Sequence, residues 1–520
     1  MTSLSGNSGR SSVLVNSNTD DSLRDLRGRS VRGVAMTVAG QGAQFLLDLL
    51  SVIILARLLV PEDFGLFAMV GAVLGLVGVL QNSGLPLAIL QSEKLEHGQM
   101  NTVFWMHLLF SVLLVTVVVV GSPLMAYLYG EPRLTLFAAV MSLTLLLQGL
   151  ALPQRALLRR QMRFGPLVTA QVTAQVCSIV IAVWFAWRGA GYWSLAVKMI
   201  AGQLCLALLC WGFSHWRPSF PSFAPGSGRL LRFGGYVTGG ELMTYAVRNA
   251  DDLFIGMAWG AVSLGFYNRA YRLLLIPLKQ VSHAVSTVAL PVLSRLQRDP
   301  PRFKRYYMTG LTALASALLP CVVFAAVKAE ALVLLVLGDQ WSAVVPVFKA
   351  FIPAAVVSVI GVGTGWAFIP LGHSDRKLRS NIIGGTATLV GFAFGLQWGA
   401  VGVAWSLSMT SVLKSLPQLA YAFRGTGMRL RDVGMGLWRP VWAVALAVLF
   451  MSLFDRWLCL WIPLELLVHA PVFLTVYCLA LFGLPGGRAE LRRWLTVLRE
   501  CSGEQWADDS VDCVGDPHDG

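Results

Sequence analysis

The chain has 520 residues, of which 56% are hydrophobic and only 13% are charged, and its formal net charge is +14. Its mean hydropathy is +0.65, whereas in soluble domains about a quarter of the residues are charged. This composition excludes an ordinary soluble globular protein and indicates an integral membrane protein.

Apolar runs long enough to cross a bilayer recur from one end of the chain to the other. A transmembrane helix needs about 20 such residues, and about fourteen runs meet that length, the thirteenth being the shortest. They lie near residues 34–56, 64–90, 101–122, 134–152, 167–186, 194–213, 236–258, 265–292, 308–327, 344–369, 381–397, 400–422, 441–454 and 462–483. We therefore predict an all-α polytopic membrane protein.

Lys and Arg set the expected orientation, because their translocation across the membrane is disfavoured. With fourteen spans, the N-terminal segment, every second loop and the C-terminal tail lie on one side, and most basic residues fall there. The opposite loops are short and hold only Arg57, Arg133, Arg188, Lys328 and Arg456. We expect both termini in the cytoplasm, basic residues facing anionic lipid headgroups, and no nucleic-acid partner.

Three short segments recur in order at a nearly constant offset, which predicts an internal duplication. "DFGLFAM" at 63–69 resembles "SLGFYNR" at 263–269, and 128–139 and 189–196 resemble 336–347 and 399–408. An even number of spans separates each pair, so the two halves share one orientation. Parallel repeats typically enclose a site between two bundles.

This pattern divides the chain into six predicted parts. In chain order they are a disordered cytoplasmic arm (1–33), a six-helix bundle (34–213), a cytoplasmic linker (214–235), a second six-helix bundle (236–422), two further transmembrane helices (423–483) and a cytoplasmic tail (484–520). In "LVPEDFG" (59–65), Pro61 and Gly65 are helix breakers and predict a turn between the first two spans.

Three charges interrupt the seventh predicted span, namely Arg248, Asp251 and Asp252. Each charge at the bilayer centre costs about 2.5 to 3.5 kcal/mol on insertion scales, so these side chains do not face lipid. Their spacing lets Arg248 pair with either Asp on one helix face, which would serve helix packing alone. Even then one negative charge remains, which calls for a further cation, a proton or water.

The eighth span supplies cations. Arg269, Arg272, Lys279 and His283 fall within an arc of roughly 80° on a helix and form one basic stripe. Arg269 and Arg272 lie close enough to the outer interface to reach it by snorkelling, whereas Lys279 lies too deep. Further lysines within predicted spans are Lys198, Lys349 and Lys414. A cationic cavity suits an anionic solute, with phosphate the first candidate.

Four stretches closely resemble the Wzx-type exporters of the multidrug/oligosaccharidyl-lipid/polysaccharide exporter superfamily, in the branch that includes the colanic acid exporter. They are "ARLLVPEDFGLFAMV" (56–70), "RNADDLFIG" (248–256), "LGFYNRAYRLLLIPLKQVSHAVSTVALPVLSRLQRD" (264–299) and "LGDQWSAVVPVFKAF" (337–351). The resemblance implies two parallel six-helix bundles around a central cavity, with two helices appended. It implies a transporter rather than an enzyme, which flips polyprenyl-diphosphate-linked repeat units across the inner membrane without a cofactor other than H+ or Na+.

The resemblance and the charges together suggest roles for individual residues. The lipid diphosphate would meet Arg248, Lys279 and Lys349, and the remaining cavity cations would be Arg269, Arg272, Lys198 and Lys414. Asp251 matches an acidic position familiar from the branch, whereas Asp252 stands where Asn is expected more often. These two carboxylates are the candidates for ion coupling.

Three alternatives stay open. A multidrug exporter of the same superfamily would predict an acidic cavity. If the chain were a polysaccharide polymerase or ligase, it would expose a sizeable periplasmic loop. If the chain is an exporter, the polymerase is instead a possible partner. A peptidoglycan-precursor flippase would share the fold and the cavity, so only substrate tests separate it. The eight cysteines contain no Cys-x-x-Cys pair, and the sequence predicts neither disulfides nor a metal site.

Overall fold

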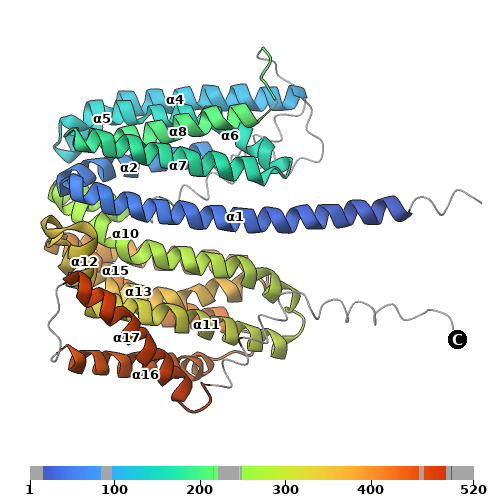
Figure 1. Ribbon diagram of the computed structural model, residues 1–520, viewed down its shortest axis with the longest axis vertical. Helices are drawn as coiled ribbons and strands as arrows, with labels where there is room; N and C mark the ends of the chain where they lie inside the picture. Colours follow the sequence, from blue (N-terminus) through green and yellow to red (C-terminus); the bar gives the residue numbers. More distant parts are fainter. Residues whose placement is uncertain are drawn as a thin grey trace, which may run out of the picture. The chain divides into compact units, whose positions relative to one another are not determined.

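The computed structural model consists of long helices (Figure 1). It describes residues 16–82, 97–214, 216–220, 245, 249–455, 462–487 and 494. Within these ranges the regular elements are α-helices and short 3-10 helices. The predicted all-α fold is confirmed.

Twelve helical stretches are long and apolar enough to cross a membrane, so the chain is a multi-pass membrane protein. Two of these stretches reverse direction. Ala250–Arg295 contains a non-helical Gly260 with φ 76°, and Asp375–Phe423 contains two helices joined at Gly399, where φ is 68°. Divided at these reversals, the stretches overlap the fourteen predicted runs, but the seventh is described only from residue 249. The number fourteen stays a prediction.

The chain separates into two compact units, the first of which comprises Met1–Val60 and Val70–Ala246. In this unit α7 packs along α8 and α1, and α6 packs along α8 (Figure 1). Leu158, Ala170 and Cys210 are fully buried where α6, α7 and α8 meet. Its helices are α1 (Asn16–Leu58), α2 (Pro61–Asn82) from Val70 onward, α4 (His97–Tyr129), α5 (Arg133–Met141), α6 (Leu143–Arg160), α7 (Phe164–Trp187) and α8 (Trp193–Phe213).

The second unit comprises Pro61–Met69 and Val247–Gly520. Here α13 packs against α10, α11 and α15, while α16 and α17 pack on each other. Its helices are the start of α2, α10 (Ala250–Arg295), α11 (Pro300–Val327), α12 (Ala329–Leu337), η1 (Asp339–Trp341), α13 (Val344–Phe368), α14 (Ser374–Gly395), η2 (Leu396–Trp398), α15 (Gly399–Phe423), α16 (Leu430–Phe454) and α17 (Ile462–Gly483).

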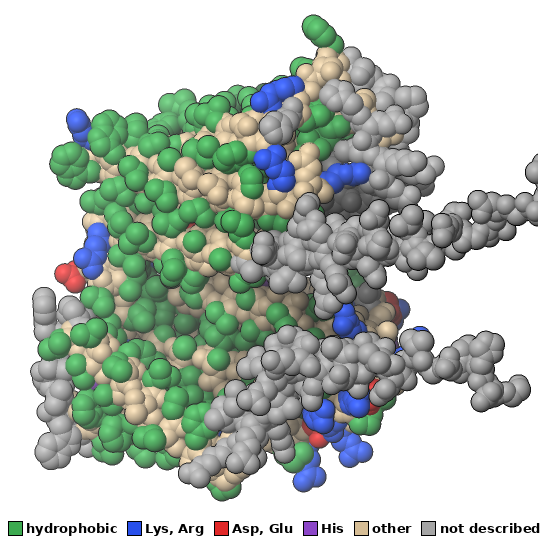
Figure 2. Space-filling model, turned by 45° about the vertical axis from the view of Figure 1, so that its right-hand side comes forward, with side chains coloured by type: hydrophobic (Ala, Val, Ile, Leu, Met, Phe, Trp, Pro, Cys, Tyr) green, Lys and Arg blue, Asp and Glu red, His purple; other side chains and the backbone are tan. Residues whose placement is uncertain are grey.

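Hydrophobic side chains cover much of the described surface seen in Figure 2. Large apolar residues such as Leu109, Ile383 and Leu413 are exposed along their helices. In water this exposure would be unfavourable, whereas in a bilayer the same side chains meet lipid while each helix satisfies its own backbone hydrogen bonds.

The start of α2 and the second half of α10 touch through their backbones. A Cβ atom on Gly65 would collide with the backbone carbonyl of Ala261, and one on Gly265 would collide with the backbone carbonyl of Pro61. The two contacts are reciprocal, and the two glycines lie 200 residues apart in the sequence, which is the offset of the first predicted repeat. Gly65 is therefore not a turn residue as predicted, but a helical residue required for close approach.

Two further boundaries differ from the predictions. The first helix begins at Asn16, so the expectation of a disordered arm is wrong for residues 16–33; extending an existing helix needs no new nucleus. The thirteenth span is a helix from Leu430 rather than from 441. Charged residues make the first turns of this helix less apolar than a typical span. One of them, Asp432, forms an ion pair with Lys304 at 2.7 Å.

Candidate functional site

Helix α10 folds back on itself at Gly260 and so brings two acidic residues against the next helical segment. The Tyr267 hydroxyl donates to Asp251 Oδ2 at 2.6 Å, and the Asn268 side-chain amide donates to Asp252 Oδ1 at 2.9 Å. Along a straight helix residues 16 apart would be separated by about 24 Å. The two halves of α10 are therefore antiparallel, as two separate spans require.

The acidic pair lies well inside the hydrophobic layer. Near the reversal, the Trp259 indole N–H donates to the Leu396 carbonyl at 2.7 Å, and Trp is typical of the membrane interface. Asp251 precedes Gly260 by nine residues, a rise of about 13 Å, and its exposed fraction is 6%. In a hydrocarbon core about 30 Å thick, this places the carboxylates near the middle.

Arg269 is buried by an aromatic contact. Its guanidinium carbon lies 3.9 Å from the Phe64 ring centroid, and its exposed fraction is 5%. Phe64 also makes an edge contact with Trp341 at 5.4 Å between ring centroids. The alternative that Arg269 snorkels to the interface is therefore wrong, because the start of α2 covers it.

The rest of the basic stripe is exposed. Arg272, Lys279 and His283 all lie at the surface of α10, while Arg269 occupies the edge of the stripe that faces α2. The Lys279 ammonium donates to the Tyr271 hydroxyl and lies 4.5 Å from that ring centroid. The sequence placed these four basic side chains on one stripe, whereas packing divides them into one that is buried and three that are accessible.

The stripe and the acidic pair belong to one electrostatic group. Asp251 interacts favourably with Lys279, and Asp252 with Arg272. Tyr271 also makes an edge contact with Phe351 of α13 at 5.7 Å between ring centroids. Helix α13 thus fixes the face of α10 from which the Lys279 ammonium projects.

The other predicted site residues lie elsewhere or outside the described part. Arg248 falls outside the described residues. Lys349 is exposed on α13, about 200° around the helix from Phe351, so it leaves α13 on the side away from the Tyr271 contact. Lys414 donates to Thr388 at 2.9 Å within the α14–α15 hairpin. Lys198, in the first unit, donates to Ser51 at 2.6 Å.

Sequence reasoning missed the partners of the acidic pair. Tyr267 and Asn268 come 16 residues after the two Asp residues, with Gly260 between them. A glycine about midway between two polar clusters within apolar sequence was the available signal, since only a reversal there brings the clusters together. Phe64 gave no such signal, because it lies about 200 residues away.

The arrangement combines two chemical capacities. Two neighbouring carboxylates, an amide and a phenol oxygen supply hard oxygen ligands that suit a proton or a hard cation. Two accessible cations on the same helix supply partners for an anion such as phosphate. A helical membrane protein that holds both within its bilayer layer has the features of a membrane transporter.

Solved transporters share this fold. One is "Lipid II flippase MurJ, inward closed conformation", with a TM-score of 0.69 at 14% identity, covering 86% of this chain and 98% of that chain. Another is an inward-facing multidrug resistance MATE family transporter of the MOP superfamily, with a TM-score of 0.58 at 14% identity, covering 74% and 94%. These likenesses show that the chain shares the fold of these two transporters.

Sequence comparison identifies the family. The family described as "Polysaccharide biosynthesis protein" matches residues 54–346, more than half of the chain. The chain belongs to this family. It is 22% identical to the lipopolysaccharide biosynthesis protein WzxC of Escherichia coli (strain K12), over 80% of this chain and 85% of that protein. It is 27% identical to the succinoglycan biosynthesis transport protein ExoT of Rhizobium meliloti (strain 1021), over 61% and 64%.

Proposed function

We propose that the protein flips polyprenyl-diphosphate-linked oligosaccharide repeat units across the bacterial inner membrane, for exopolysaccharide, capsule or O-antigen synthesis. The observation that carries the proposal is the exposed part of the basic stripe, Arg272, Lys279 and His283, beside a buried acidic pair. The fold and the family support it, since relatives of the chain are named as polysaccharide transporters and flippases.

The diphosphate of the carrier is the group that the stripe recognises. Lys279 offers a point charge and Arg272 a planar guanidinium for paired hydrogen bonds. Tyr271 positions the Lys279 ammonium and donates or accepts a further hydrogen bond. Arg248 is added to the proposed set from the sequence. Lys349 leaves α13 on the side away from Tyr271, so Lys349, Lys198, Arg269 and Lys414 are further candidates from the sequence only. The polyprenyl chain remains in lipid throughout.

Ion coupling is assigned to Asp251 and Asp252. Tyr267 and Asn268 each donate a hydrogen bond to one carboxylate, which holds the pair in place but leaves its charge to be balanced. H+ or Na+ would bind preferentially in one conformation, and the diphosphate would bind beside the stripe in the other. Each ligand would then shift the population toward the conformation that it prefers.

The proposal includes the topology and the surroundings. Both termini face the cytoplasm, so that the basic loops stay on the side where the lipid-linked unit is made. The polysaccharide polymerase is the natural partner, because it consumes the flipped unit. A multidrug exporter is disfavoured by three accessible basic side chains on α10, and a peptidoglycan-precursor flippase differs only in its substrate.

The first test is export in a strain that lacks the protein. The native chain, Lys279→Met and the matched control Lys377→Met are expressed at equal membrane level, and the lipid-linked precursor is assayed in each leaflet. We expect the native chain and the control to restore polysaccharide export. Lys279→Met should leave intact precursor in the cytoplasmic leaflet, with export reduced at least about tenfold, as expected when one charged hydrogen-bonding partner is lost.

Two outcomes would contradict the proposal. If precursor accumulates unpolymerised in the periplasmic leaflet when the protein is absent, the chain acts after flipping, as a polymerase or ligase would. If the native chain instead rescues a strain depleted of its peptidoglycan-precursor flippase and fails to restore polysaccharide export, its substrate is the peptidoglycan precursor.

A further inference from the structure

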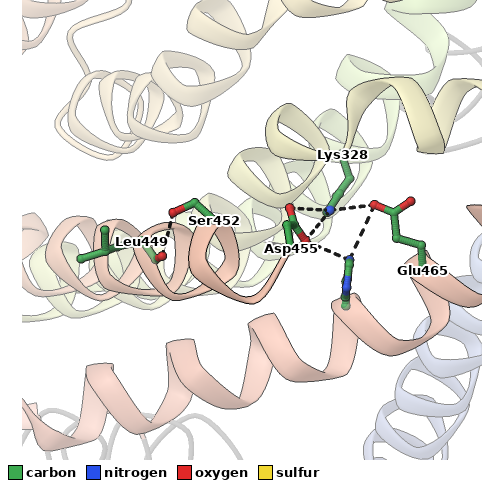
Figure 3. A network of polar contacts seen from close by, with 6 residues as sticks. Lys328, Leu449, Ser452, Asp455 and Glu465 are labelled. Atoms are coloured by element: carbon green, nitrogen blue, oxygen red, sulfur yellow. Dashed lines mark hydrogen bonds and ion pairs between the residues drawn. The ribbon is translucent and has the colours of Figure 1, made fainter. Parts of the chain in front are cut away.

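A second polar cluster, distant in sequence from α10, joins the ends of three elements of the second unit (Figure 3). Lys328 stands between α11 and α12, Asp455 ends α16, and Glu465 lies in the first turn of α17. The Lys328 ammonium donates to both Asp455 oxygens at 2.8 Å and to Glu465 Oε1 at 2.7 Å. One ammonium thus holds two carboxylates from two helices.

A buried histidine points into the same cluster. His469 on α17 is fully buried, and its ring packs at 5.5 Å from the Phe454 ring. Its Nδ1 lies 3.4 Å from Asp455 Oδ1 and 3.7 Å from Glu465 Oε1. Among the described residues neither ring nitrogen has a hydrogen-bond partner, although buried polar groups normally have one.

The distances from His469 to the two carboxylates are close to those between ligands of one metal ion. Zinc binds His nitrogen and carboxylate oxygen at about 2.0–2.2 Å in a tetrahedron, which places neighbouring ligand atoms about 3.3–3.6 Å apart. The distances from His469 Nδ1 to the two carboxylates are 3.4 and 3.7 Å, and all three ligand atoms lie within 4.8 Å of one another. The His469 ring nitrogen therefore lies at nearly the distance from both carboxylates that one shared ion would impose.

We propose that Asp455, Glu465 and His469 form a binding site for zinc or a similar divalent cation, for which the Lys328 ammonium competes. With neutral His469, the two carboxylates and Lys328 carry a net charge of about −1; a divalent cation that displaces the ammonium brings the three ligands to neutrality. One His and two carboxylates leave the fourth tetrahedral position to water.

The cluster is open on the side of its carboxylates. The side-chain exposed fractions are 34% for Asp455 and 23% for Glu465, against 7% for Lys328. An ion therefore reaches the carboxylates from solvent without passing the lysine stem. The metal must therefore displace the Lys328 ammonium, which donates to both carboxylates.

Metal binding would change which helices are joined. The ammonium ties α16 and α17 to the junction of α11 and α12, whereas the three metal ligands belong to α16 and α17 alone. Binding would strengthen the terminal helix pair and release its polar link to α11 and α12. The last two helices would then depend on the metal concentration for their attachment.

The test is zinc binding by the untagged full-length protein in detergent, measured by titration calorimetry. Four proteins are compared, namely the native chain, Lys328→Met, His469→Gln and the control His373→Gln, which alters a half-buried histidine outside the cluster. We expect Lys328→Met to bind at least about tenfold more tightly than the native chain, because charge-assisted hydrogen bonds no longer compete. His469→Gln should bind about tenfold or more weakly, and His373→Gln should not differ from native.

A cobalt spectrum decides the matter independently of Lys328→Met, should that variant fail to fold. Co2+ added to the native chain should give the strong visible absorption of a tetrahedral site, and His469→Gln should lose it. Zinc affinity and cobalt absorption that are the same in the native chain and His469→Gln would overturn the proposal, and the cluster would then be a closed ion pair. None of these measurements depends on transport.

Discussion

Gly65 offers a sharp test of how the start of α2 is held. Replacing it by Ala adds one carbon that meets the Ala261 carbonyl group, and no side-chain rotation can relieve a contact between backbones. Overpacking costs typically about 1–3 kcal/mol, and we take the upper value because both partners are backbone. Ala gains about 0.8–1.0 kcal/mol over Gly in a helix. The expected net loss of stability is about 2 kcal/mol.

Gly434→Ala is the matched control. Gly65 and Gly434 are each the fifth residue of their helices, α2 and α16, but a Cβ on Gly434 meets nothing within 4 Å. The control should be stabilised by up to about 1 kcal/mol, so the two variants should differ by about 3 kcal/mol. At about 2–4 °C per kcal/mol for units of this size, the Tm values should differ by roughly 6 to 12 °C.

The assay is thermal unfolding of the purified variants in detergent, with the folded fraction checked by size-exclusion chromatography. Gly265→Ala should behave like Gly65→Ala, because the contact with Pro61 is its counterpart. The double variant should lose less than the sum of the two single losses, since one separation of the helices relieves both collisions. Equal Tm values for Gly65→Ala and Gly434→Ala would refute the close approach.

Two further predictions concern charged groups. Since the carboxylates raise the pKa of Lys328 above its usual 10.5, the stability that its ion pairs contribute is fully present below that pH and is lost as the pH rises through the folded-state pKa. The Tm difference between the native chain and Lys328→Met should therefore shrink in alkaline buffer, and a constant difference would count against the ion pairs. Arg269→Lys should lower stability by about 1–2 kcal/mol because Lys cannot stack on Phe64 as a planar group. The exposed Arg272→Lys should change the Tm little, and an equal effect of both would contradict the buried contact.

The location of the spans was predictable because lipid imposes a simple rule. A span must be apolar for about 20 residues, and the helices of the structure overlap each predicted run. The rule failed at the start of one helix, where charged residues come first. The predicted thirteenth span began at 441, whereas α16 begins at Leu430, because Lys304 neutralises Asp432 from another helix. Such a partner is invisible to local hydropathy.

The candidate site was predictable as a set of charges but not as an arrangement. Helical periodicity correctly placed Arg272 and Lys279 on one arc of α10, and both are exposed. It could not separate Arg269 from them, since that depends on Phe64, which belongs to α2. The proposed metal-binding cluster was missed for the same reason, because Lys328 lies more than 100 residues before Asp455 and Glu465 in the sequence.

The partners of the acidic pair bear most directly on mechanism. The sequence allowed Arg248 to pair with either Asp251 or Asp252, which would still leave one negative charge unbalanced. Arg248 lies outside the described residues, and in the described part of the chain the direct partners are Tyr267 and Asn268, which are uncharged donors. Such donors orient the carboxylates without cancelling their charge, and burying an unbalanced charge in lipid is costly. In the proposed mechanism, a bound proton or cation and the Lys279 and Arg272 charges that a diphosphate would engage balance the charge that these donors leave.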